Sequence, residues 1–224
     1  MISDEILEAQ EGQVASMFRY YRQMMQEQIE FWQLTDGIDI HTESHCERVL
    51  LLALKLGDLR ELKLRSMIAL SHASIFHDTR RKDNYLDQGH GDRAAEYYRE
   101  FCDAHNIKYL PEVYATIKYH DRDDAQGEEY IRKEAPKHSL ASEGEKSDDT
   151  EGWLEVYHSF KDADALDRYR LGPWGLAPKF LRSEQSRSLM PFAQQLVKDT
   201  IDEETMKKVM EVTRPFAERM KRGE

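Results

Sequence analysis

Apolar residues recur about every 3.6 positions along most of the chain, which is the spacing of amphipathic helices. The first such stretch covers residues 5–33 and places Ile6, Val14, Phe18 and Trp32 near this period. No stretch alternates apolar and polar residues in the manner of a β-strand. The pattern therefore predicts an all-α fold. Further helices are expected over residues 42–56, 58–77, 92–105, 111–119, 153–171, 184–198 and 202–221.

One polar segment interrupts this pattern. Residues 122–152 are rich in glycine, serine and aspartate and show no sustained apolar period. We expect a long flexible loop here, directly before the helix that carries Asp164. A loop in this position can act as a lid over a site or can be a tolerated surface insertion, and the sequence leaves both open.

Composition narrows the class of protein. The chain has 224 residues, of which 40% are hydrophobic and 33% are charged, values typical of a globular domain. The longest apolar run, VLLLALKLG, is too short to cross a bilayer. The N-terminal MISDEILEAQ lacks the features of a secretory signal, and two cysteines are too few for a disulfide framework. We therefore expect a cytoplasmic protein.

The charge of the chain restricts its partners. A net charge of −11 disfavours general binding to nucleic acid and to anionic membranes, because both depend on Lys and Arg residues that neutralise phosphates. A small phosphorylated molecule can still bind if a metal ion supplies positive charge locally. The amphipathic terminal helices fit either a monomer or a homodimer.

The candidate chemistry lies in histidine and aspartate side chains. Each candidate also has an ordinary explanation, as a polar residue at a helix end or on a solvated face. The candidates are His41 and His45, which are four residues apart; the pair His77-Asp78 at the end of an apolar helix; His90, between two glycines; His120; and Asp164, flanked by alanines.

Taken in chain order, these residues carry a resemblance. The motifs HTESHCERV, FHDTRRKDNYLDQGHG, YHD and DADALDRYRLG resemble, in this order, the motifs of HD-domain metal-dependent phosphohydrolases. The resemblance covers residues 38–182 and implies a single HD-domain helical bundle. Residues 1–37 would then form an N-terminal helix packing on the domain, and residues 183–224 would form C-terminal helices that complete it.

The resemblance also implies a role for each residue. Two metal ions would share a bridging aspartate, here Asp78. His41 matches a position where some relatives place an additional ligand, and the sequence leaves open whether it is a ligand, supports one or does neither. The other implied ligands are His45, His77 and Asp164 for the first ion and His90 and His120 for the second.

The residue types fit metal-assisted phosphate chemistry. Imidazole and carboxylate donors suit Mn, Fe, Co, Ni or Zn better than Mg or Ca. Two such ions about 3.5–4 Å apart lower the pKa of a shared water and neutralise the phosphoryl oxygens. Because both intermediate histidines of the HD-type pattern are present, the resemblance implies two divalent transition-metal ions per chain. Arginines near the motifs can grip phosphate at two points, and Arg81 and Arg168 are selected because the resemblance runs through both.

The expected function is hydrolysis of a phosphate ester by a metal-bound hydroxide, with Asp78, Arg81 and Arg168 as the catalytic residues. The substrate would be a nucleotide or another small phosphorylated metabolite. The C-terminal part of the HD-GYP signature is absent after Asp164, so a cyclic dinucleotide is not the first choice. Two alternatives use nearly the same ligands: an HD-type di-iron oxygenase, and a non-catalytic metal-bound module with a regulatory or binding role.

Overall fold

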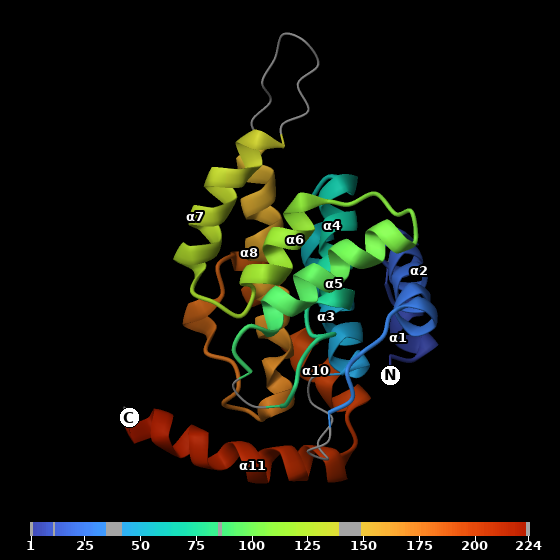
Figure 1. Cartoon of the computed structure of the whole chain (residues 1–224). Helices are drawn as coiled ribbons and strands as arrows, with labels where there is room; N and C mark the ends of the chain where they lie inside the picture. The colour runs from blue at the N-terminus through green and yellow to red at the C-terminus, as the bar shows by residue number, and fades with distance from the viewer. Residues whose placement is uncertain (1, 11, 35–41, 85–86, 139–148, 223–224) are drawn as a thin grey trace.

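The computed structural model describes residues 2–10, 12–34, 42–84, 87–138 and 149–222, with side chains up to residue 214. These residues form eleven α-helices, three short 3-10 helices and no strand, arranged as a helical bundle (Figure 1). The all-α prediction is therefore confirmed. The α-helices are α1 (Asp4–Glu8), α2 (Gly12–Gln28), α3 (Glu43–Leu59), α4 (Leu64–Phe76), α5 (His90–Ala104), α6 (Pro111–Tyr119), α7 (Asp124–Glu134), α8 (Thr150–Leu166), α9 (Glu184–Ser188), α10 (Met190–Thr200) and α11 (Glu203–Arg222). The 3-10 helices are η1 (Ala135–Lys137), η2 (Asp167–Leu171) and η3 (Pro178–Phe180).

Helix α3 occupies the centre of the bundle. It packs against α2, α4 and α8, and all of its residues from His45 to Leu54 are buried. A helix that is apolar on every side needs neighbours on every side. The leucine-rich run VLLLALKL, which is too short for a membrane span, is therefore the central core helix.

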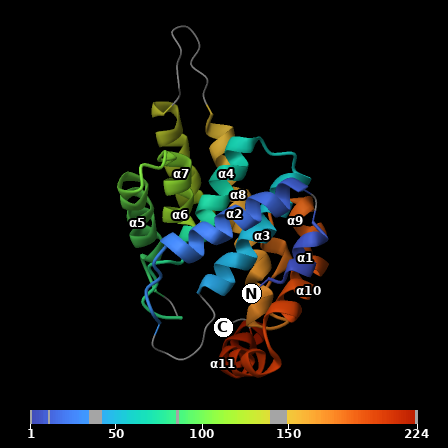
Figure 2. The same ribbon diagram turned by 90° about the vertical axis from the view of Figure 1, so that its right-hand side faces the viewer.

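The two ends of the chain add to the same core. Phe18 and Met25 of α2 and Ala193 and Leu196 of α10 are buried in the main hydrophobic cluster. Helix α11 lies across one end of the bundle in both views (Figures 1 and 2). Its Val209 is fully buried, and Thr213 donates a hydrogen bond to the carbonyl of Leu171 in η2. No helix in the described part of the chain combines the length and the apolar character that crossing a membrane requires.

The prediction of a flexible loop over residues 122–152 is wrong for the first half of this segment, which forms α7 and η1. Gly127, Ile131 and Ala135 are spaced by four residues and face α6 and α8, where a second hydrophobic cluster lies. A Cβ atom on Gly127 would lie 2.4 Å from the ring of Tyr157, so α7 packs closely on α8. Two of these three residues are small, so the apolar period along α7 is too weak to detect in the sequence. Residues 139–148 of the expected loop lie outside the described residues.

Other helix boundaries also differ from the prediction. The stretch over 5–33 is divided into α1 and α2, and the helix expected from residue 58 begins only at Leu64, because Asp58 lies inside α3. The stretch over 184–198 is divided into α9 and α10 near Leu189. Pro191 explains the last break, because proline lacks an N–H and fits the first turn of a new helix.

Candidate metal centre

Helix ends bring the candidate residues together. His45 lies in the first turn of α3 and His90 is the first residue of α5, whereas His77 and His120 cap the C-termini of α4 and α6. Asp78 follows His77 directly. All five residues are buried. Asp164 joins them from the last turn of α8.

One group of donor atoms consists of His45, His77 and Asp78, whose candidate ligand atoms lie within 4.8 Å of one another. His45 Nε2 is 3.1 Å from His77 Nε2, and Asp78 Oδ2 is 3.6 Å from the first and 3.7 Å from the second. Asp164 Oδ1 lies 3.3 Å from His45 Nε2, and its side chain is 29% exposed. Asp164 therefore lies beside this group, next to His45 and on its more open side.

A second group consists of Asp78, His90 and His120, again within 4.8 Å. His90 Nε2 is 2.9 Å from His120 Nε2. Asp78 Oδ1 is 3.3 Å from the ring of His90 and 3.6 Å from that of His120. Asp78 thus belongs to both groups and turns one carboxylate oxygen toward each, so a metal ion in either group would contact its own oxygen of this residue.

Gly91 allows the second group to form. A Cβ atom at this position would lie 2.8 Å from the carbonyl oxygen of Ile117 and 2.9 Å from that of Lys118. The start of α5 therefore rests directly on the last turn of α6, and this contact brings His90 beside His120. The His-Gly pair in the sequence has a physical meaning: histidine supplies the donor, and glycine supplies the close approach.

The hydrogen bonds of the four histidines orient their rings in the same way. The Nδ1 atoms of His77, His90 and His120 lie 3.0, 2.7 and 2.7 Å from the carbonyl oxygens of Ser74, Asp87 and Ile117. A carbonyl oxygen can only accept, so each Nδ1 must carry the proton. His45 Nδ1 lies 2.7 Å from a carboxylate oxygen of Asp167 and donates in the same way. Every neutral ring therefore directs the lone pair of Nε2 toward the donor groups.

This arrangement fits a bound cation. When both rings of a pair are neutral, two Nε2 lone pairs face each other, across 3.1 Å in the first group and across 2.9 Å in the second. Lone pairs at this separation repel each other, and a metal ion between them converts the repulsion into coordination. Carbonyl or carboxylate groups that hold the remote nitrogen are also the usual support for metal-binding histidines. The residues present therefore fit divalent transition-metal ions.

The pKa values of two donors favour the states that bind metal. Burial lowers the pKa of His77 to about 3, so its ring is neutral at neutral pH. Burial opposes ionisation of Asp164, but the hydrogen bond and charge of the protonated form of His45 outweigh burial and hold the pKa of Asp164 well below its usual range, and a metal ion would take the place of that proton. His120 differs. Burial disfavours its charged form, yet the hydrogen bond and charge of Asp78 raise its pKa, and a metal ion would displace the proton.

Sequence reasoning missed Asp167 and Arg48. Asp167 is fully buried, and it accepts hydrogen bonds from His45 Nδ1 at 2.7 Å and from Arg48 Nε at 2.6 Å. Arg170 Nη1 lies 3.6 Å from the same carboxylate. Burial by itself raises the pKa of Asp167. The charge of Arg48 and the hydrogen bond from His45 outweigh burial, and together they lower this pKa to about 2. The available signal was the i, i+3 spacing of Asp164 and Asp167.

The two arginines selected from the sequence lie in different surroundings. Arg81 is buried, with Nη1 3.2 Å from His90 Nε2 and 3.6 Å from Asp78 Oδ1. Arg168 is exposed, and its Nε donates to the carbonyl of Gly175 at 2.8 Å. Arg81 is therefore adjacent to the second donor group, and a phosphate role for Arg168 stays a prediction. His41 lies outside the described residues.

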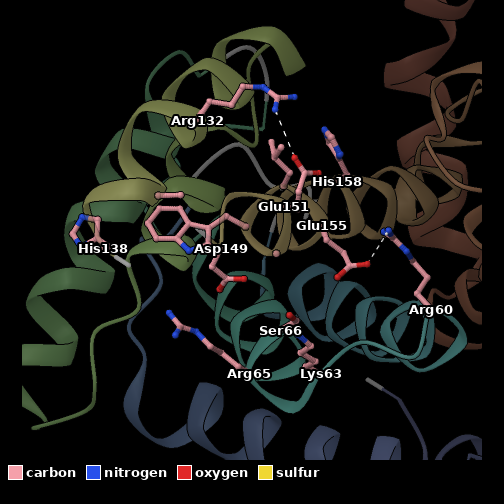
Figure 3. Close-up of a pocket in the computed structure, with 14 residues that line it drawn as sticks. Arg60, Lys63, Arg65, Ser66, Arg132, His138, Asp149, Glu151, Glu155 and His158 are labelled. Carbon is pink, nitrogen blue, oxygen red and sulfur yellow. Dashed lines mark hydrogen bonds and ion pairs between the residues drawn. The ribbon is translucent and has the colours of Figure 1, made fainter. Parts of the chain in front are cut away.

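A cavity of about 810 Å³ lies elsewhere, between the C-terminal end of α3, the start of α4, and the first turns of α8 (Figure 3). None of the metal-ligand candidates among the described residues lines it. Arg60, at the cavity, is about 22 Å from His45 along the axis of α3 at 1.5 Å per residue. Two pairs of charged side chains in the cavity lining contact each other, Arg60 with Glu155 at 3.4 Å and Arg132 with Glu151 at 3.9 Å (Figure 3). The cavity is separate from the metal centre.

Comparison with protein-family models, with curated proteins and with solved structures found no match to this chain.

Proposed function

We propose that this protein is a metal-dependent phosphohydrolase of the HD-domain type, acting on a nucleotide or another small phosphorylated metabolite. One observation carries the proposal: each carboxylate oxygen of Asp78 faces a different pair of imidazole nitrogens. A carboxylate between two histidine pairs can be shared by two metal ions, as a two-metal hydrolytic centre uses them. The same residues occupy the HD-type motifs in chain order.

The surroundings of the donors support phosphate chemistry. Bound metal ions would supply an activated water and neutralise charge on the phosphoryl oxygens. The protein contributes Arg81, whose guanidinium is held beside the second donor group and can grip phosphate oxygens at two points. Asp164 is the donor on the more open side, so we expect the substrate to approach past it. A buried arginine next to the donors favours an anionic substrate.

The first test is the metal content of the purified protein, measured by elemental mass spectrometry on a preparation made without chelating tags. The wild type should carry close to two transition-metal ions per chain, and Asp78→Ala should lose both, because Asp78 belongs to both donor groups. Asp58→Ala is the matched control: this aspartate is exposed on α3, the helix that carries His45.

The metal-loaded protein is then assayed on phosphate monoesters, diesters and nucleoside triphosphates. Release of phosphate that depends on metal and is lost in Asp78→Ala would support the proposal. If iron predominates and the protein consumes oxygen, the chain is an oxygenase and the proposal is wrong. If the protein stays empty after Mn, Fe or Ni is added back, the hydrolytic function also fails.

A further inference from the structure

The two donor groups differ in the charges around them. Among the described residues, the first group has three donors, and a second carboxylate, that of Asp164, lies 3.3 Å from its His45 Nε2. The second group also has three donors, and its carboxylate is Asp78, which the two groups share. More negative donors bind a divalent cation more strongly, because the attraction scales with the charges at contact distance.

The support behind the histidines differs as well. His45 donates to the carboxylate of Asp167, which Arg48 holds through Nε at 2.6 Å and Nη2 at 3.1 Å. His90 and His120 instead donate to main-chain carbonyls. Asp121 Oδ2 lies 3.4 Å from His90 Nδ1, farther away than the carbonyl of Asp87 at 2.7 Å. A fixed carboxylate behind an imidazole holds the ring more firmly and increases its basicity.

A cation already lies beside the second group. Arg81 Nη1 is 3.2 Å from His90 Nε2, the atom that would bind a metal ion, and 3.6 Å from Asp78 Oδ1. The arginines near the first group lie differently. Arg48 and Arg170 contact Asp167, which lies behind His45 Nδ1, and the charge of Arg170 also acts on Asp164 and Asp78. A metal ion entering the second group must therefore meet a guanidinium 3.2 Å from a ligand nitrogen, whereas near the first group the arginines contact the supporting carboxylate of Asp167.

We propose that the two metal sites are unequal and fill in order. The group of His45, His77, Asp78 and Asp164 binds the first ion tightly, with Asp167 as the residue that positions His45. The group of Asp78, His90 and His120 binds a second ion weakly, in competition with Arg81. This inference rests on the proposed function only in requiring that metal binds at all.

The test is a titration of metal-free protein with Mn²⁺, in which calorimetry gives the affinity of each site and electron paramagnetic resonance counts the free ion. The wild type should show two separate affinities. Asp167→Asn keeps the shape of the side chain and should weaken the tight site about 10–100-fold, with the weak site unchanged. Asp167→Glu keeps the charge and should recover part of the loss, which a purely structural defect would not do.

Arg81→Gln tests the second part of the proposal, that Arg81 competes with the metal ion at the weak site. Removal of one positive charge a few ångströms from the ligands should strengthen the weak site by about tenfold. Arg80→Gln is the matched control, because Arg80 stacks on the ring of Tyr97 and donates to the carbonyl of Glu30 instead. It should leave both affinities unchanged.

The outcomes separate this inference from the proposed function. Two equal affinities, or an Arg81→Gln variant whose weak site does not improve, would overturn unequal loading and leave a two-metal hydrolase intact. Equal weakening of both sites by Asp167→Asn would overturn the positioning role of Asp167. Absence of any Mn²⁺ binding would remove the proposed function as well.

Discussion

Replacing Gly91 by alanine tests the contact that brings the two halves of the second donor group together. In an open helix this change stabilises by up to about 1 kcal/mol, because alanine loses less backbone freedom on folding than glycine. Here the added Cβ would lie 2.8 and 2.9 Å from two carbonyl oxygens of α6 and 3.0 Å from Asp121 Oδ1, whereas ordinary contact begins at 3.4 Å. Helix α5 must therefore retreat from α6 by about 0.5 Å.

The size of the effect follows from these two opposing contributions. Overpacking costs about 1–3 kcal/mol, and the upper value applies because two of the three contacts are main-chain atoms that cannot change rotamer. With an alanine gain of about 1 kcal/mol, Gly91→Ala should destabilise the fold by about 2 kcal/mol. For a chain of this size that lowers Tm by about 4–8 °C.

The assay is thermal unfolding followed by circular dichroism in the presence of a chelator, so that metal binding does not contribute. Gly12→Ala is the matched control, because Gly12 begins α2 and a Cβ there would meet no atom within 4 Å. The control should have an unchanged or slightly raised Tm. If Gly91→Ala behaves like Gly12→Ala, α5 does not rest on α6, and the reasoning about the second donor group is refuted.

Three further predictions concern stability. Burial lowers the pKa of His72 to about 4, so the unfolded chain takes up the proton first, and the free energy of unfolding falls as the pH drops from about 6.5 to about 4. In urea unfolding at a series of pH values, His72→Leu should remove up to about 3 kcal/mol of this loss. An unchanged pH dependence would contradict the prediction. Arg48→Met removes the main positive charge beside the buried Asp167 carboxylate and should lower the free energy of unfolding in urea by about 3–5 kcal/mol. Arg168→Met, at an exposed arginine, is the control and should cost less than about 1 kcal/mol. Equal losses would show that Asp167 does not depend on Arg48. Ile131→Ala empties a fully buried position of α7 and should cost about 2–4 kcal/mol in the same assay, and a loss below 0.5 kcal/mol would mean that α7 is not packed on the bundle.

The sequence alone was sufficient for the helical class and for the ligand candidates. Apolar periodicity is local, so α3, α5 and α6 could be located from neighbouring residues, with small errors at helix ends, such as the end of α3 beyond Asp58. The resemblance of the motifs, in chain order, to those of HD-domain proteins was also sufficient to select the five residues of the two donor groups. Helix α7 was missed because its packing depends on the ring of Tyr157, which lies far along the chain.

Only the tertiary structure decided how these residues act on one another. Contacts between distant segments place each oxygen of Asp78 beside a different pair of histidines. Such contacts also place the Asp167 carboxylate behind His45, although these two residues are 122 positions apart in the sequence. The same applies to the arginines. Arg81 lies against the donors and Arg168 faces solvent, although both follow their motifs closely in the sequence. Spacing along a helix determines which residues share a face. The packing of the other helices determines whether that face points toward the donors or toward solvent, and which charges lie opposite it.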